Sequence, residues 1–396
     1  MSNPNRIGGI DFARGLVLVA IMIDHVPGNV LEFVTPRNFA LSDSAEAFVF
    51  LSGVSVGVAY YRKSIISGLG AVTRSCLGRA SRIYGAHIAL TLCAVAIFGL
   101  CYTLSGFPSL IEAHGRTVVF HDPVQGAIGV ALLTHQLGYF NILPLYVVLM
   151  AISPLILAVA KIEPLLALLV AGGGYVAVRL LDINLPNWPQ PGAWFLNPFA
   201  WQLIFTLGIV AAIRWRQQAP QRSPMIWTLC VVVTAASAIV VNDGFGLAPG
   251  LHDRAFAVLD VGKQDLGAAR LINFLALAYL AATSPFFAQL GRTPLGEALQ
   301  SLGRNSLTIF AASSVLSAIG QAGLAGWGPS VTEDVAKGLE FGYTLACIGG
   351  LFALARYLEW RKALKDNRFP PSTGADGGGA SWRSPRLALA RWVSAH

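Results

Sequence analysis

The chain has 396 residues, of which 55% are hydrophobic and 12% are charged, and its formal net charge is +8. Soluble domains usually carry about 25% charged residues, so this composition excludes an ordinary water-soluble domain and indicates an integral membrane protein. The excess of basic residues does not indicate nucleic-acid binding, because these residues sit in short loops beside apolar runs. The five cysteines form no CxxC pair, so we expect neither a disulfide framework nor a metal site.

Apolar runs of about 20 residues, long enough for a helix to cross a ~30 Å hydrocarbon core, recur along the whole chain. They predict an all-α integral membrane fold of about ten transmembrane helices. The expected spans lie near residues 10–30, 41–61, 83–105, 141–160, 164–181, 197–213, 224–242, 269–289, 304–323 and 338–359. Asp11 and Arg14 interrupt the first run, so we expect it to be retained and not cleaved as a signal peptide. Segment 123–137 is too short to span and predicts a partial or re-entrant helix.

The distribution of Lys and Arg predicts the orientation. With the N-terminus inside, 21 of the 28 basic residues fall on one side, so both termini are expected in the cytoplasm of a bacterial cell, with the protein in the inner membrane. We expect a transmembrane domain over residues 1–362 and a flexible basic tail over 363–396, whose last residues could form an amphipathic surface helix. No internal repeat is visible, which weighs against a transporter.

Ionisable side chains inside the first expected helix are costly there and so indicate function. Arg14 and His25 are eleven residues apart, which corresponds to ~16.5 Å of rise and only ~20° of net rotation, so they share one face. Asp11 can pair with Arg14, and a neutral His25 near the outer third of the membrane could act as a base. The alternatives are a structural histidine with a backbone partner and a snorkelling arginine.

The second expected helix begins with two carboxylates, Asp43 and Glu46, at the depth of His25. A carboxylate that bonds one imidazole nitrogen makes the other a better base, as acyl transfer requires, so Glu46 or Asp24 could orient His25. Asp43 could instead be only the helix cap.

Before the third expected helix, Arg79 and Arg82 in GRASRIYG could clamp the phosphates of a nucleotide-like donor. They could equally be positive-inside anchors or ligands of lipid headgroups. Two other polar residues, His87 and Gln202, could line a cavity, but interhelical hydrogen bonds are the expected role.

Several stretches, among them DFARGLVLVAIMIDHVPGNV, SDSAEAFVFLSG, FLNPFAWQLIF and LGRNSLTIF, resemble the OpgC family of membrane glucan succinyltransferases, within acyltransferase family three. The resemblance implies that Arg14 and His25 match the family's arginine–histidine pair, Glu46 its acid, and Arg79 and Arg82 its arginine pair. The family usually has an acid where this chain has Asn141, so the choice of acceptor or donor could differ here.

The resemblance predicts an O-acyltransferase that takes an acyl group from acyl-CoA, succinyl-CoA in the family, and gives it to a periplasmic glucan or other polysaccharide. No permanently bound cofactor is expected, and membrane lipids are the expected surroundings. His25 would be the base or be acylated first. Arg37, on a periplasmic loop, is a candidate for binding the distal succinyl carboxylate. The rival readings are a proton-coupled glycan or lipid transporter or flippase, and a membrane scaffold.

Overall fold

A computed structural model describes residues 8–26, 28, 30–327 and 332–368 of the protein. Apart from one isolated bridge, regular structure in these residues is helical, which confirms the all-α prediction. The long helices are α1 (Gly8–Asp24), α2 (Ser44–Ile66), α3 (Gly68–Ser105), α7 (Ile142–Ile162), α8 (Pro164–Leu180), α9 (Pro198–Trp215), α10 (Pro224–Val241), α12 (Ala268–Thr283), α15 (Ser306–Trp327) and α16 (Glu333–Arg368). The short ones are η1 (Val30–Val34), η2 (Pro36–Asn38), α4 (Ser109–Glu112), α5 (Thr117–His121), α6 (Pro123–Ala131), α11 (Leu251–Val258), α13 (Pro285–Leu290) and α14 (Pro294–Arg304).

A helix coincides with each of the ten expected spans. Among the described residues, seven helices are long and apolar enough to cross a membrane, namely α2, α3, α7, α9, α10, α15 and α16. Helices α8 and α12 are apolar but shorter, and α1 has 17 residues. The chain therefore has the helices of a multi-pass membrane protein, while the exact number of spans stays a prediction. Segment 123–137 contains only the short helix α6, as predicted.

The outer surface of the helices is apolar, as contact with lipid requires. Helix α10 buries only Cys230 and Ser237, and leaves large side chains such as Met225, Leu229 and Val232 exposed. On a protein in water, apolar patches of this kind would drive association. In a bilayer the same residues face hydrocarbon, so their exposure needs no partner chain.

Proline and short polar residues set where the helices begin. Helices α6, α8, α9, α10, α13 and α14 have proline in their first turn, where its missing N–H costs nothing. The side chain before the proline often completes the start: Asn197 accepts from the Phe199 amide at α9, and Thr293 from the Gly296 amide at α14. The starts of the helices are thus encoded locally.

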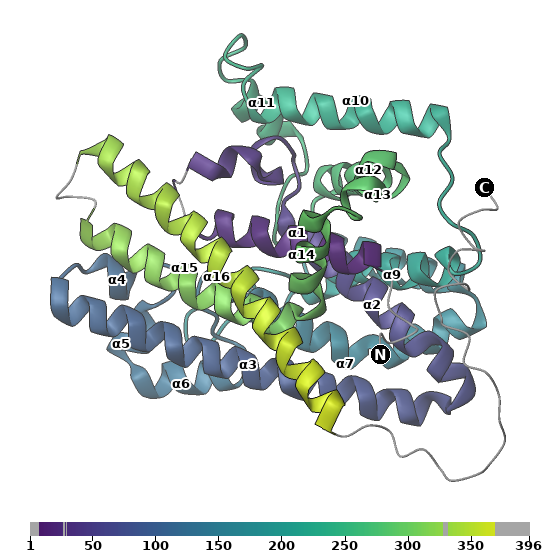
Figure 1. Cartoon of the computed structure of the whole chain (residues 1–396), viewed down its shortest axis with the longest axis horizontal. Helices are drawn as coiled ribbons and strands as arrows, with labels where there is room; N and C mark the ends of the chain where they lie inside the picture. The colour runs from purple at the N-terminus through teal and green to yellow at the C-terminus, as the bar shows by residue number, and fades with distance from the viewer. Residues whose placement is uncertain (1–7, 27, 29, 328–331, 369–396) are drawn as a thin grey trace. The chain divides into compact units, whose positions relative to one another are not determined.

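Close helix pairs hold the bundle together (Figure 1). Helix α2 packs along α9, α1 against α14, and α3 against both α7 and α15. Glycine permits the α2–α9 contact, because a Cβ on Gly53 would lie 2.0 Å from the Phe205 oxygen and one on Gly208 would lie 2.1 Å from the Phe50 oxygen. Fully buried Trp201 and Phe205 place α9 in the core.

Residues up to Arg356 form one compact unit, and the packing described above belongs to it. Tyr357 begins a second unit, which contains the last turns of α16. Helix α16 continues to Arg368, and the domain boundary expected at 362 stays a prediction. The remainder of the predicted tail, 369–396, lies outside the described residues.

Candidate active site

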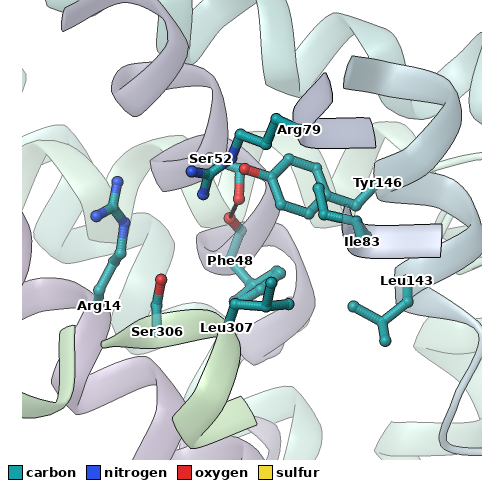
Figure 2. A pocket seen from close by; sticks show the side chains of 9 residues that line it. All are labelled: Arg14, Phe48, Ser52, Arg79, Ile83, Leu143, Tyr146, Ser306 and Leu307. Carbon is teal, nitrogen blue, oxygen red and sulfur yellow. Dashed lines mark hydrogen bonds between the residues drawn. The ribbon is translucent and has the colours of Figure 1, made fainter. Parts of the chain in front are cut away.

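A small cavity lies where α1, α2, α3, α7 and α15 meet. Figure 2 shows Arg14 on one side of it and the guanidinium of Arg79 pointing toward that side. The other lining side chains are Phe48, Ser52, Ile83, Leu143, Tyr146, Ser306 and Leu307. Its volume is about 20 Å³, room for about one water molecule. Two arginines at one enclosed, mostly apolar cavity are suited to bind an anion.

Local contacts hold Arg14 in place. Its Nη1 lies 3.4 Å from Oδ1 of Asp11, one turn earlier on α1, so the predicted pair is present. Its Nη2 donates to the Leu51 oxygen of α2 at 3.4 Å. Asp11 is buried, which means that part of the arginine charge is compensated before any ligand binds.

The predicted clamp of Arg79 and Arg82 is divided in the structure. Arg79 is half-buried and lies beside the Tyr146 phenol at the cavity (Figure 2). Arg82 is exposed, does not line the cavity, and its Nε donates to the Gly78 oxygen of its own helix at 3.2 Å. Three residues turn a helix by ~300°, so the two side chains are ~60° apart, enough to separate a buried edge from the surface. The structure therefore pairs Arg79 with Arg14 and leaves Arg82 outside.

His25 follows directly after the other end of α1. Its amide donates to the Ile21 oxygen at 3.1 Å, so helical geometry continues from Arg14 to His25. The rise and rotation that were calculated for eleven helical residues therefore apply to this pair. Its carbonyl accepts from Nε2 of Gln321 on α15 at 2.8 Å. The half-buried ring packs edge-on against Tyr139, with centroids 5.0 Å apart. Within the described residues no hydrogen bond to the ring is present, which leaves its nitrogens available to a substrate.

Asp43 and Glu46 join a charged network at the start of α2. They form a capping box, in which Asp43 accepts from the Ala45 amide at 2.8 Å and Glu46 accepts from the Asp43 amide at 2.9 Å. Arg270 of α12 donates to Oε1 of Glu46 at 2.7 Å and to Oδ2 of Asp43 at 3.0 Å. Lys263 lies 2.5 Å from that same Asp43 oxygen. Asp43 is thus both helix cap and ion-pair partner.

The structure does not bring Glu46 to His25, which corrects the expected orienting contact. Glu46 is fully buried, and its two oxygens bind Arg270 and the Asp43 amide. Asp24 accepts from Oγ of Ser44 at 3.4 Å, while its other oxygen is buried without a hydrogen-bond partner among the described residues. Neither carboxylate bonds the imidazole, because N3 of a capped helix directs Glu46 back to its own N-terminus.

The family model described as OpgC protein matches residues 6–363, nearly the whole chain. The chain belongs to the OpgC family. Comparisons with curated proteins and with solved structures give no match. This OpgC chain is therefore a membrane acyltransferase-like protein. Of the arginine–histidine pair that the resemblance implies, Arg14 lies within α1 and His25 directly follows its last residue.

The sequence did not predict that two basic residues of this OpgC chain, Lys263 and Arg270, belong to the site. They lie more than 200 positions from the carboxylates they bind, so spacing within a helix gave no indication. A usable signal was present, however. Both are among the few basic residues that fall on the predicted periplasmic side, where the positive-inside rule provides no reason for them.

An aromatic and basic group beside His25 was also not predicted. Tyr139, which contacts His25, contacts the ring of His114 as well, with centroids 5.2 Å apart. Arg116 is buried, lies 3.9 Å over the Phe98 ring and donates to the Ser109 oxygen. Burial lowers the pKa of Arg116 to about 10, so its guanidinium stays charged at neutral pH.

The remaining predicted residues lie at this same end. Arg37 is exposed in η2, and Lys263, Asp43 and Arg37 are the charged groups that act electrostatically on His25. Asn141 directly precedes α7, two residues after Tyr139, and its side chain does not cap the helix. The structure therefore brings the charges of Arg37 and Asp43 near His25, while Asn141 is placed only by its position two residues after Tyr139.

Proposed function

We propose that this OpgC-family protein is an inner-membrane O-acyltransferase that moves an acyl group from acyl-CoA to a hydroxyl of a periplasmic glucan or related polysaccharide. The donor binds from the cytoplasm, and succinyl-CoA is the donor that the family resemblance favours. Arg14 and Arg79 bind donor phosphates. His25 carries the chemistry, and the thioester reaches it without the coenzyme crossing the membrane.

The observation that carries the proposal is the separation of the two groups along one helix. Arg14 and His25 are joined by unbroken helical geometry, which gives ~16.5 Å of rise, about the length of an extended pantetheine arm. A second arginine, Arg79, joins Arg14 at the cavity. Because that cavity has room for about one water, the lining side chains must move apart when the donor binds.

The transfer balances as a single displacement. A nitrogen of neutral His25 removes the proton of the sugar hydroxyl while the hydroxyl oxygen attacks the carbonyl carbon of the thioester. The carbon–sulfur bond then breaks, the new ester stays on the sugar, and the imidazolium returns the proton to the leaving thiolate. If His25 is acylated first, an imidazole nitrogen forms a bond to the acyl carbon as the carbon–sulfur bond breaks, and the thiolate takes up the imidazole proton. The sugar oxygen then forms the ester as the carbon–nitrogen bond breaks, and the hydroxyl proton passes to the imidazole.

The cations around His25 suit a dicarboxylic acyl group. Arg37 is exposed and close enough to act on His25, so its guanidinium can bind the distal carboxylate of a succinyl thioester that has reached the imidazole. Lys263 and Arg270 already neutralise Asp43 and Glu46, and buried Arg116 is held over the Phe98 ring and by the Ser109 oxygen. Arg37 is therefore our candidate for this task.

The proposal is tested with purified protein in lipid nanodiscs, supplied with succinyl-CoA and glucan. Ester formation is measured by mass spectrometry and free coenzyme A by a thiol reagent. His25→Ala should lose at least about 100-fold in rate, the lower end of what a general base contributes. His121→Ala, which removes an exposed imidazole from α5, is the matched control and should retain full activity.

Two results would contradict the proposal. Undiminished turnover by a folded His25→Ala protein would remove this residue from the mechanism. If the wild-type protein moves glycan across a vesicle membrane while no thioester is consumed, the transporter reading replaces the enzyme.

A further inference from the structure

Two buried polar side chains on α3 have no hydrogen-bond partner within the ranges that the structure describes. His87 is 0% exposed, and neither ring nitrogen has a hydrogen-bond partner among the described residues. Thr91, one turn further along, is 2% exposed, and its hydroxyl is likewise unpartnered. The sequence predicted interhelical hydrogen bonds for His87, and the described part of the chain provides none.

Thr91 differs from the other serine and threonine residues of its own helix. Each of the others donates to a backbone oxygen three or four residues earlier, and these are Thr73, Ser75, Ser81, Thr103 and Ser105. Such bonding within the helix is the usual way to satisfy a hydroxyl in an apolar environment. Thr91 has the same option and does not use it, so its hydroxyl is directed elsewhere.

His87 and Thr91 follow, along α3, a residue that lines the cavity at Arg14. Ile83, which lines that cavity, is followed by His87 and Thr91 at intervals of four residues, so the three lie within ~80° on α3. Measured along the helix, His87 lies ~12 Å and Thr91 ~18 Å beyond Arg79. This range matches the ~16.5 Å from Arg14 to His25.

Unpartnered polar groups in a membrane interior cost free energy, and a fold that keeps them normally uses them. A partner must supply donors and acceptors at this depth. A donor thioester that extends from the arginines to His25 does so, because its pantetheine arm carries two amides between apolar methylenes. A neutral imidazole and a hydroxyl can each both donate and accept a hydrogen bond.

We propose that His87 and Thr91 bind the amide groups of the pantetheine arm and so position the thioester. The inference rests on the proposed function and adds α3 as a second wall of the donor path, with Arg79 at its phosphate end. Both residues are positioning residues, because neither touches the reacting atoms.

The test compares donors that possess and lack these amides. His87→Leu and Thr91→Val are assayed with succinyl-CoA, with succinyl-pantetheine and with a succinyl thioester of a simple alkanethiol. We expect the KM of the two amide-bearing donors to rise about tenfold, with kcat/KM for the alkyl thioester unchanged. Thermal stability should stay the same or rise, because an unpartnered buried group is removed.

Control variants distinguish an effect on donor binding from an effect on folding. Thr103→Val removes a hydroxyl that its own helix satisfies, and it should leave all three donors unaffected. If His87→Leu does not fold, His87→Gln, which keeps a donor and an acceptor, should fold and retain most of the affinity. An equal loss with all donors, or no loss with any, would overturn the proposal. If the wild-type protein uses no thioester at all, the proposed function itself has failed, and this inference with it.

Discussion

Arg79 and Arg82 look equivalent in the sequence but have different surroundings in the structure. Their spacing puts both near the same side of α3, and the positive-inside rule applies equally to each. Only the structure separates them, because Tyr146 of α7 lies beside Arg79 at the cavity (Figure 2), whereas Arg82 is exposed and does not line the cavity. Their contributions to donor binding should therefore differ.

We expect Arg79→Ala to raise the KM for acyl-CoA about tenfold, equivalent to ~1.4 kcal/mol of binding free energy, since it removes a half-buried cation from the cavity. Arg82→Ala should change KM less than twofold. Both are measured by steady-state kinetics in nanodiscs, with the exposed Arg292→Ala as the control. If the two substitutions have equal effects, the donor phosphates do not bind at the cavity.

Arg37 should determine which acyl group is transferred. Arg37→Ala is expected to lower kcat/KM for succinyl-CoA about tenfold, the loss of one charge-assisted contact of ~1.4 kcal/mol at an exposed site. Acetyl-CoA, which has no distal carboxylate, should be used as well as before. The measurement is competition between the two donors, read as the ratio of ester masses on the glucan. An unchanged ratio would exclude Arg37 from acyl recognition.

The charged residues around His25 show which parts of the site can be predicted from the sequence. Helical arithmetic could predict the spacing of Arg14 and His25, because both lie in one continuous stretch of helix. It failed for Glu46, whose partner Arg270 comes from a helix more than 200 positions later. Such a pairing depends on how helices assemble, and no spacing within one helix contains that information.

At the scale of elements, local signals predicted the helices and tertiary contacts remained hidden. Apolar length, capping residues and proline determine where α2 and α9 lie in the sequence. That these two pack together depends on Gly53 and Gly208, which let their backbones approach. Glycine is common in membrane helices, so the sequence alone gave no reason to select these two.

Gly53→Ala should destabilise the protein, because its new methyl group would lie 2.0 Å from the Phe205 carbonyl oxygen and force α2 and α9 apart. Overpacking of this kind typically costs ~1–3 kcal/mol. Gly172→Ala on α8 is the matched control: nothing lies within 4 Å of the added carbon, and alanine favours a helix by up to ~1 kcal/mol. Thermal unfolding in detergent should show a lower midpoint for the first variant only. Equal unfolding midpoints for the wild type and the Gly53→Ala variant would mean that α2 and α9 do not approach each other as described.

At the scale of the whole molecule, apolar surface and charge distribution constrain where the chemistry occurs. Helices such as α10 expose apolar faces of the kind that a bilayer covers, and the arginine cavity and His25 lie at different levels along α1. The proposed function requires the level of the arginine cavity to face the compartment that contains coenzyme A. Orientation in the membrane decides whether the proposed donor can reach Arg14 and Arg79.

The charge bias predicts that both termini lie in the cytoplasm. The donor assignment requires this of the N-terminal side of α1, because coenzyme A is a cytoplasmic metabolite. Fluorescent-protein fusions at each terminus should be bright, and alkaline phosphatase inserted in the 182–197 loop should be active, since each reporter works in one compartment only. The same phosphatase fused at the C-terminus is the control and should be inactive. A bright N-terminal fusion with an active C-terminal phosphatase would mean an odd number of spans. Reversed activity at all sites would put the arginine cavity on the periplasmic side, where acyl-CoA cannot bind it.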